Sequence, residues 1–260
     1  MHRATFRFYA DLNDFLPPER RSESFEVRFF GTPSVKDLIE AIGVPHPEVD
    51  LVLADGAPVG FGWRVADGAR VAVYPAFSSM DVAPVAAARP PPLPDLRFVL
   101  DGHLGRLARY LRLAGFDAAW DRAAADAELA RLAAGTQRIL LTRDVGLLKR
   151  REVSHGRWVR ATDPARQLAE VVRRYDLARL AAPFTRCLRC NAVLEPVARD
   201  AIAERLPPRV RERHDVFTRC PSCDRLYWAG THQRRMQQLL DGVLRLAPGR
   251  LTPGAPPGSR

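Results

Sequence analysis

Three aspartates in the middle of the sequence have the spacing of a divalent-cation site. Asp101 directly follows the apolar run 98–100, and Asp144 comes three residues after the apolar run 139–141, while Asp126 stands between them, early in a helical pattern. Carboxylates at the carboxyl ends of strands in an open α/β sheet converge on the crevice where ligands bind. They repel one another unless a cation lies between them, and hard oxygen ligands suit Mg²⁺ or Mn²⁺. The pattern predicts a metal-dependent hydrolase, with a phosphodiester as its substrate.

Each aspartate also has a structural interpretation. Asp126 could be a helix N-terminal charge that the helix dipole favours, and Asp144 could cap the helix that follows it. Asp121 and Glu128 are the nearest substitutes if Asp126 is not a ligand. Asp163 is the weakest candidate for a fourth ligand, because an aspartate directly before proline is typical of a helix cap.

The four cysteines form two CxxC pairs, Cys187 with Cys190 and Cys220 with Cys223, which enclose 29 residues. Each pair can present two thiolates to one ion, and four thiolates in a tetrahedral array make a closed structural Zn²⁺ site. Two disulfides or free thiols are the alternative, but paired CxxC spacing in an intracellular protein favours metal. The sequence therefore predicts a structural zinc site with four cysteine ligands.

Basic residues lie close in sequence to the three aspartates. Arg106, Arg109, Arg143 and Lys149 are candidates to bind the phosphates that flank the cleaved bond. A solvated helix face is an equal alternative for any single one of them. His103, which follows the first apolar run, is a further candidate for substrate contact.

The cysteine segment is rich in arginine and contains the aromatic residues Phe217, Tyr227 and Trp228. Aromatic side chains beside a basic surface often hold single-stranded nucleic acid by base stacking. The same residues could instead pack this segment onto the preceding domain. The sequence leaves both interpretations open.

Apolar runs alternate with helical patterns through residues 96–175, which predicts a parallel sheet with helices between its strands. The first helix follows Gly102, and Gly115 ends it. Its apolar face contains Leu104, Leu107, Ala108 and Leu111, and its other faces are expected to carry Arg106, Arg109 and Arg112. In the helix 126–134, Leu129 and Leu132 are expected to point inward. The four expected strands cover residues 98–100, 116–120, 138–142 and 158–160.

The N-terminal part has the order of a small α+β domain. Residues 3–9 and 24–30 alternate at period two, as half-buried strands do, and a turn-rich connection lies between them. Ser34 begins a helix that Gly43 ends. Two more strands follow, over residues 51–53 and 70–74, with a turn at Asp55-Gly56 between them.

Charge divides the chain unevenly. Its formal net charge is +10, but residues 1–94 contain 9 Lys and Arg against 12 Asp and Glu, and residues 95–260 contain 31 against 18. The basic part suggests a polyanionic partner, which favours nucleic acid. There is no apolar run of the length a bilayer requires and no signal-peptide pattern at the N-terminus, so a cytoplasmic protein is expected.

Several separated motifs resemble one known family, in the same order. The central motifs are LDGHLGRLARYLRLAGFD, DAEL, RILLTRDVGLLKR and DPARQL, and the later ones are FTRCLRCN, FTRCPSCDRLYW and GTHQRRM. Over about residues 96–240 they resemble the Mut7-C ribonuclease domain, which is a PIN-like nuclease domain followed by a zinc ribbon. The N-terminal segment, from FRFYADLNDFL to VADGARVAVYP, resembles the ubiquitin-like β-grasp domain that is fused ahead of Mut7-C domains.

The resemblance implies the fold class and the domain layout. We expect an α/β protein with a PIN-like parallel-sheet nuclease domain (96–180) and a C-terminal zinc ribbon (181–245). An α+β ubiquitin-like β-grasp domain (1–80) and an Ala/Pro-rich linker (81–95) precede them, and a disordered tail (246–260) follows. In this family the positions of Asp101, Asp126 and Asp144 hold the catalytic metal. The N-terminal domain lacks the terminal Gly-Gly of sulfur carriers, so a docking or substrate-guiding role is expected for it, with no partner identified.

The function expected from residues and resemblance together is hydrolysis of RNA, with catalytic Mg²⁺ or Mn²⁺ and structural Zn²⁺. The partner is RNA, which includes tRNA or another structured RNA, and no membrane is involved. The alternative is a non-catalytic RNA-binding adaptor associated with tRNA or ribosomes. A Rossmann-like small-molecule enzyme is disfavoured, because no GxGxxG follows the first strand.

Overall fold

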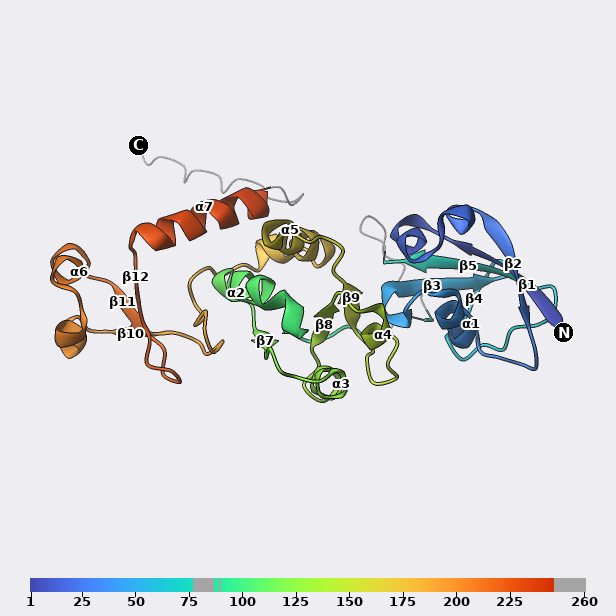
Figure 1. The fold of residues 1–260 in the computed structure, drawn as a ribbon, viewed down its shortest axis with the longest axis horizontal. Helices are drawn as coiled ribbons and strands as arrows, with labels where there is room; N and C mark the ends of the chain where they lie inside the picture. Colours follow the sequence, from blue (N-terminus) through green and yellow to red (C-terminus); the bar gives the residue numbers. More distant parts are fainter. Residues whose placement is uncertain (77–86, 89, 246–260) are drawn as a thin grey trace, which may run out of the picture. The chain divides into compact units, whose positions relative to one another are not determined.

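The computed structural model describes residues 1–76, 87–88 and 90–245, apart from the side chains of 231, 232 and 245 (Figure 1). The chain divides into two compact units, one made of Met1–His103 with Ala123–Trp158 and the other of Leu104–Arg122 with Val159–Arg260. Seven of the fifteen residues of the predicted linker (81–86 and 89) and the predicted disordered tail (246–260) lie outside the described residues. The domain boundaries expected from the sequence stay predictions.

The first unit begins with a five-stranded sheet in the order β2-β1-β5-β3-β4. The two N-terminal strands are antiparallel, β1 runs parallel to β5, and β3 pairs antiparallel with both β5 and β4. With one helix packed on the sheet, this is the ubiquitin-like β-grasp fold that the sequence predicted. The strands are β1 (His2–Phe8), β2 (Ser24–Phe29), β3 (Val49–Ala54), β4 (Ala57–Pro58) and β5 (Arg70–Pro75).

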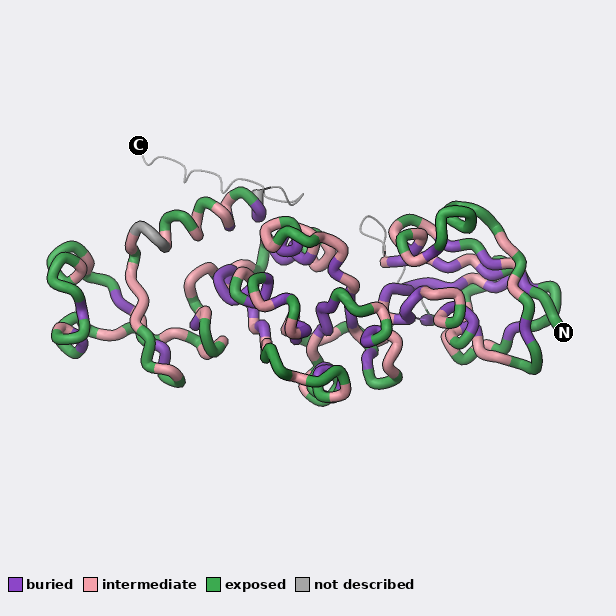
Figure 2. The backbone as a smooth tube through the Cα atoms, viewed as in Figure 1, coloured by how far each residue is buried: buried purple, intermediate pink, exposed green. Residues whose placement is uncertain are grey.

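Local signals in the sequence explain the helix of this fold. Helix α1 (Val35–Ile42) begins after Ser34, whose hydroxyl accepts a hydrogen bond from the amide of Asp37, while the Asp37 carboxylate accepts one from the Ser34 amide. It ends at Gly43, whose φ of +129° would strain any other residue. Figure 2 shows the buried stretches along the strands that this helix covers. The predicted helix and both of its ends are confirmed.

The segment between β1 and β2 is more structured than the predicted turn-rich connection. It forms two 3₁₀ helices, η1 (Ala10–Phe15) and η2 (Pro18–Arg20). Leu12 and Leu16 are fully buried and belong to the core of the β-grasp fold. A later 3₁₀ helix, η3 (His46–Glu48), leads into β3.

Three strands of the first unit form a parallel ladder. They are β6 (Phe98–Leu100), β8 (Ile139–Thr142) and β9 (Gly156–Trp158), with β8 in the centre. Helices α3 (Asp126–Gly135) and α4 (Val145–Leu148) pack against them. Two expectations were wrong in detail. The strand predicted at 158–160 lies two residues earlier, and Leu132 points outward at 39% exposure, because Leu129, Ala130 and Ala133 already supply the buried face of α3.

The second unit holds the remaining elements. Helix α2 (Gly105–Leu113) packs against strand β7 (Ala118–Trp120) and helix α5 (Pro164–Arg174), and α5 packs against α7 (Thr231–Arg245). An antiparallel sheet contains β10 (Glu195–Val197), β11 (Phe217–Arg219) and β12 (Leu226–Trp228), and the helices η6 (Asp200–Arg205) and α6 (Pro208–Arg213) lie between β10 and β11 in the chain. The 3₁₀ helix η5 (Leu177–Arg179) also belongs to this unit, whereas η4 (Gly102–Leu104) begins in the first unit and ends at the first residue of the second. None of the described helices has the length and hydropathy needed to cross a bilayer.

A buried ion pair joins the β-grasp fold to strand β9. The two terminal nitrogens of Arg157 donate to Glu48 Oε2 at 2.5 Å and to Asp11 Oδ2 at 2.7 Å. The amide of Trp158 donates to the other oxygen of Glu48 at 2.6 Å, and the Trp158 ring packs against Phe15. These contacts hold the acidic N-terminal fold against the end of the parallel ladder.

We expect Glu48→Gln to lower the free energy of unfolding of this unit by about 3 kcal/mol. The amide would remove the charge of a fully buried carboxylate that pairs with the buried guanidinium of Arg157, and weaker compensation of a buried charge is costly. The control is Glu26→Gln, which neutralises a half-exposed carboxylate paired with Arg3 and Arg28 and should cost less than about 1 kcal/mol. Urea unfolding measures both, and equal losses would contradict the prediction.

Candidate active site and metal centre

Asp101 lies at the carboxyl end of β6, and both of its carboxylate oxygens accept hydrogen bonds. It is 5% exposed, and its Oδ1 accepts a hydrogen bond from the amide of His103 at 2.9 Å. Its Oδ2 accepts from the amide of Arg143 at 3.0 Å and from the hydroxyl of Thr142. Both oxygens are therefore fixed by donors from the chain, and two of the three donors come from the end of the neighbouring strand β8.

Asp144 follows that neighbouring strand and caps α4. Its Oδ1 accepts from the amides of Gly146 at 2.7 Å and Leu147 at 3.4 Å, which confirms the capping interpretation. Its own amide donates to the Thr142 hydroxyl oxygen at 2.9 Å. Thr142 therefore connects Asp101 and Asp144 through one hydroxyl. Within the described part of the chain, no hydrogen bond or ion pair engages Oδ2 of Asp144, and the residue is exposed.

Asp126 is the first residue of α3 and is exposed. The nearby Glu128 accepts a hydrogen bond from the Ala125 amide at 3.1 Å, so it closes the start of that helix. Asp163 caps α5 through the amides of Ala165 and Arg166, as its Asp-Pro context predicted. Among the residues that the structure describes, the three aspartates do not form a group with ligand atoms within 4.8 Å of one another.

The basic residues predicted to bind phosphate have different surroundings. Arg143 is exposed and directly precedes Asp144 in the sequence. Lys149 donates from Nζ to the carbonyl of Glu40 at 2.7 Å, so its ammonium group already has a partner on α1. Arg106 and Arg109 are exposed on α2 of the second unit, and His103 is exposed after β6.

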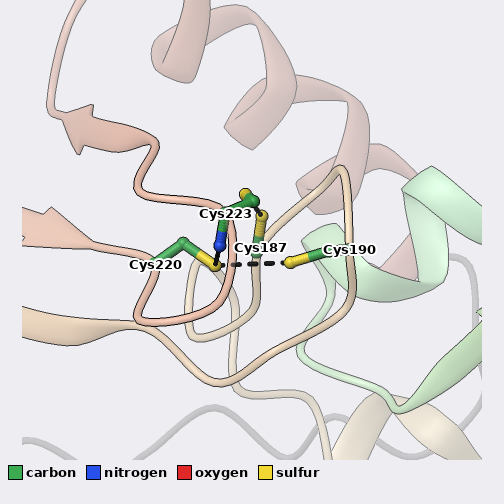
Figure 3. A group of neighbouring side chains, drawn as sticks. All are labelled: Cys187, Cys190, Cys220 and Cys223. Atoms are coloured by element: carbon green, nitrogen blue, oxygen red, sulfur yellow. Dashed lines mark hydrogen bonds between the residues drawn. The ribbon is translucent and has the colours of Figure 1, made fainter.

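The four cysteines form a compact group, as their spacing predicted (Figure 3). All four sulfur atoms lie within 4.8 Å of one another, with Cys187 Sγ 3.5 Å from Cys223 Sγ and Cys190 Sγ 3.3 Å from Cys220 Sγ. None of the four forms a disulfide. Four soft sulfur donors in one small cluster fit Zn²⁺ in a closed structural site.

Both CxxC turns have the same backbone arrangement. In the first, the Asn191 amide donates to the Cys187 carbonyl at 3.0 Å, and in the second the Asp224 amide donates to the Cys220 carbonyl at 3.0 Å. Asn191 and Asp224 have φ values of +74° and +58°, a left-handed conformation that these short polar residues tolerate. Each turn therefore points its two thiols at one position between the turns.

The environment of the metal-free thiols is asymmetric. Burial raises the pKa of the Cys187 thiol, but hydrogen bonds from the Tyr227 hydroxyl and from backbone amides outweigh it and lower the pKa to about 6. Burial raises the pKa of the Cys223 thiol to about 12, and its cysteine neighbours add to the effect. The Tyr227 hydroxyl and the backbone amides therefore favour the thiolate form of Cys187.

Two residues that support the cysteine site were missed by the sequence analysis. Tyr227 places its hydroxyl 3.1 Å from Cys187 Sγ and accepts from the Leu188 amide at 3.1 Å. Arg112, expected on the outer side of α2, is 3% exposed and donates to the carbonyls of Ala118, Leu188 and Arg189. Its spacing was an available signal, because position 112 follows Leu104 and Ala108 at intervals of four and so shares the apolar face.

We expect Arg112→Met to destabilise the first cysteine turn by about 3 kcal/mol. Methionine keeps much of the volume but leaves three carbonyls without their donor, and it removes a positive charge beside the thiolates of Cys187 and Cys190. The readout is the rate at which a chromophoric chelator removes zinc, which should rise at least tenfold. Arg109→Met, one turn earlier on the exposed face of α2, is the control, and an equal rate in both variants would contradict the prediction.

The comparisons with known proteins cover nearly the whole described chain. The Mut7-C RNAse domain model matches residues 96–240, and the Mut7-C ubiquitin model matches residues 1–81. Two crystal structures of the small archaeal modifier protein 1 of Haloferax volcanii are similar to part of the chain. One is 19% identical and covers 29% of this chain and 98% of that one, and the other is 22% identical and covers 30% and 99%, both with a TM-score of 0.24. No curated protein matches the chain.

Proposed function

Because the chain belongs to the family of the Mut7-C RNAse domain, we propose that it is a metal-dependent ribonuclease whose active site contains Asp101, Asp126 and Asp144. The observation that carries this proposal is the coupling of Asp101 to Asp144 through Thr142 at the ends of two adjacent parallel strands. Strand ends of this kind are where α/β sheets bind their ligands. The proposed layout remains a β-grasp domain (1–80), a PIN-like nuclease domain (96–180) and a zinc ribbon (181–245).

The two strand-end carboxylates have complementary properties in this proposal. Asp101 is rigid, because three donors fix its oxygens, whereas Asp144 keeps Oδ2 available while Oδ1 caps α4. A Mg²⁺ or Mn²⁺ ion held there would activate a water molecule and neutralise the charge that develops on the scissile phosphate. Thr142 keeps the two carboxylates in register, so it is a positioning residue.

The direction of helix α3 relative to strand β8 supports the inclusion of Asp126 in the proposed active site. Helix α3 packs against β6 and β8 and ends four residues before β8 begins. So short a connection reverses the chain, which places the N-terminus of α3 toward the edge where β8 ends. A third carboxylate at this edge could reach the cation directly or through water, because Mg²⁺ usually keeps several waters in its shell.

The other predicted residues have supporting roles. Arg143 and Lys149 would contact phosphates beside the cleaved bond, and Arg106 and Arg109, which belong to the second unit, would contact other phosphates of the RNA. The four cysteines would hold a structural zinc that aids RNA binding by shaping the ribbon, with no part in the chemistry. The choice of RNA over DNA follows from the family, and structured RNAs such as tRNA are included among the proposed substrates.

Incubation of the purified protein with end-labelled RNA tests the proposal. Cleavage is expected with Mg²⁺ or Mn²⁺ and not with Ca²⁺ or without added divalent cation. Asp126→Asn should reduce the rate if the third carboxylate reaches the cation. Cleavage that is indifferent to the divalent cation would refute the carboxylate mechanism.

A non-catalytic RNA-binding adaptor is the second candidate function. The observation that favours it is the engagement of both Asp101 oxygens by donors of the chain, together with the finding that the ligand atoms of the three aspartates do not all lie within 4.8 Å of one another. Tight RNA binding without cleavage under any divalent cation would support the adaptor.

A further inference from the structure

A cleft of about 370 Å³ in the second unit is lined by α2, α7 and the first cysteine turn. Three of its lining side chains are arginines, two from α2 and one from α7, and no carboxylate lines it. All three arginines are exposed, and within the described part of the chain none of them forms an ion pair or a side-chain hydrogen bond. The residues that matter here are Arg106, Arg109, Arg235, Tyr110, Leu188 and Met236.

The positive charge of these three arginines is not neutralised by a carboxylate of the lining, so the cleft favours the binding of an anion. Arg112 lies one turn beyond Arg109 on the same helix, but its guanidinium donates inward to backbone carbonyls and adds a further positive charge nearby. A guanidinium group can form paired hydrogen bonds with two phosphate oxygens. Three guanidinium groups around one cleft therefore favour a phosphate group, which has several acceptor oxygens, over an anion with a single acceptor atom.

A second hollow, of about 490 Å³, shares Leu188 and Met236 with the arginine cleft. Its lining is mainly apolar and includes the aromatic rings of Phe184, Tyr227 and Trp228. The Tyr227 ring is fixed, because its hydroxyl is bonded to Cys187 Sγ and to the Leu188 amide. A rigid aromatic cavity of this kind suits the flat face of a nucleobase.

We propose that the two hollows form one binding site for single-stranded nucleic acid, with a phosphate in the arginine cleft and a neighbouring base in the aromatic cavity. A base that enters the cavity must leave the stack of a double helix, and the unstacked bases of single strands are the ones that proteins hold on aromatic side chains. The proposal deepens the proposed function by naming single-stranded RNA as its substrate class, and it rests on that function only for the choice of RNA. Tyr227 and Trp228 line this cavity, which supports the base-stacking role for them, whereas Phe217 is buried in the core of the ribbon.

The test measures binding of a fluorescein-labelled ten-nucleotide oligouridylate at several salt concentrations, without added Mg²⁺ or Mn²⁺. Arg106→Ala, Arg109→Ala and Arg235→Ala should each weaken binding about tenfold and reduce the slope of log Kd against log salt by about 0.7. Arg209→Ala, at an exposed arginine of α6 in the same unit, is the matched control and should change binding less than twofold.

The cavity is tested without removing any packed aromatic. Ala229 is exposed and lines the cavity, so Ala229→Leu should fill part of it and weaken binding about tenfold with an unchanged salt slope. Zinc content and circular dichroism report whether each variant is folded. A double-stranded RNA of the same length should bind at least tenfold more weakly than the single strand.

Two results would overturn the proposal. One is a loss of affinity in the three arginine variants no larger than in Arg209→Ala, and the other is equal binding of single and double strands. Because no step of this test requires cleavage, a protein that binds as expected but does not cut RNA would refute only the nuclease. A protein that cuts RNA with unchanged rate and affinity in all these variants would refute only the binding site.

Discussion

Removal of the metal from the four-cysteine site is expected to unfold residues 186–228 while the β-grasp sheet keeps its structure. The core of the ribbon contains three buried apolar residues, Ile202, Leu206 and Phe217, whereas the β-grasp core contains seventeen. Burial of an apolar side chain contributes only about 1.5–3 kcal/mol, so three of them contribute less than a structural zinc, which supplies roughly 10–16 kcal/mol in small domains. The ribbon therefore depends on its metal, whereas the β-grasp core does not.

Hydrogen–deuterium exchange with and without a zinc chelator measures this effect. Peptides across β10, β11 and β12 should lose protection when zinc is removed, and peptides from β1 and β5 should not. Cys220→Ser should reproduce the loss, whereas Ser222→Ala, an exposed residue of the same turn, should not. Elemental analysis is expected to give one zinc per chain. Unchanged protection of the ribbon after complete zinc removal would contradict the structural role of the site.

The parts of this structure that the sequence predicts are set by neighbours in the chain. The cap at Ser34, the cap at Asp163 and the two CxxC turns each depend on residues within about five positions of one another. Strand and helix positions also follow, because an apolar run or a 3.6-residue period is a local property.

The parts that the sequence does not predict depend on partners far along the chain. Arg157 and Glu48 are 109 residues apart, and the bond from Arg112 to the Leu188 carbonyl spans 76 residues. In both cases the guanidinium of a buried arginine donates to an acceptor far along the chain. Only the position of Arg112 on an apolar face indicated this beforehand.

The candidate active site shows the same division. The strand-end positions of Asp101 and Asp144 follow from the two apolar runs, whereas the hydroxyl of Thr142 that connects them depends on the parallel pairing of β6 with β8. Spacing alone also cannot separate a cap from a ligand, and Asp144 has the geometry of a cap. An experiment must therefore remove its charge and keep its capping ability.

Asp144→Asn is expected to lower the rate of RNA cleavage by about 1,000-fold and to change the free energy of unfolding by less than about 0.5 kcal/mol. Asparagine caps helices as well as aspartate does, so the hydrogen bonds to Gly146 and Leu147 can persist. The loss of negative charge, in contrast, removes a proposed cation ligand. Replacement of residues that merely support metal ligands already costs 10–100-fold, so a direct ligand should cost about tenfold more. Asp101→Asn is a poorer choice, because both oxygens of Asp101 accept hydrogen bonds from donors of the chain. The amide nitrogen of asparagine would replace one of these oxygens and would face a donor, which is costly in a buried site.

The matched control is Asp163→Asn, which makes the same chemical change at a cap of the same kind. Asp163 accepts from the amides of Ala165 and Arg166 at the start of α5, is exposed, and has no proposed part in catalysis. Its variant should keep the stability and the cleavage rate of the original protein. Initial rates with saturating Mn²⁺, and again across a Mn²⁺ titration, separate a lost ligand from a weakened one, because a weakened site recovers at high metal concentration. If Asp144→Asn cleaves RNA as fast as Asp163→Asn at every Mn²⁺ concentration, then Asp144 is a helix cap alone and the catalytic cation lies elsewhere.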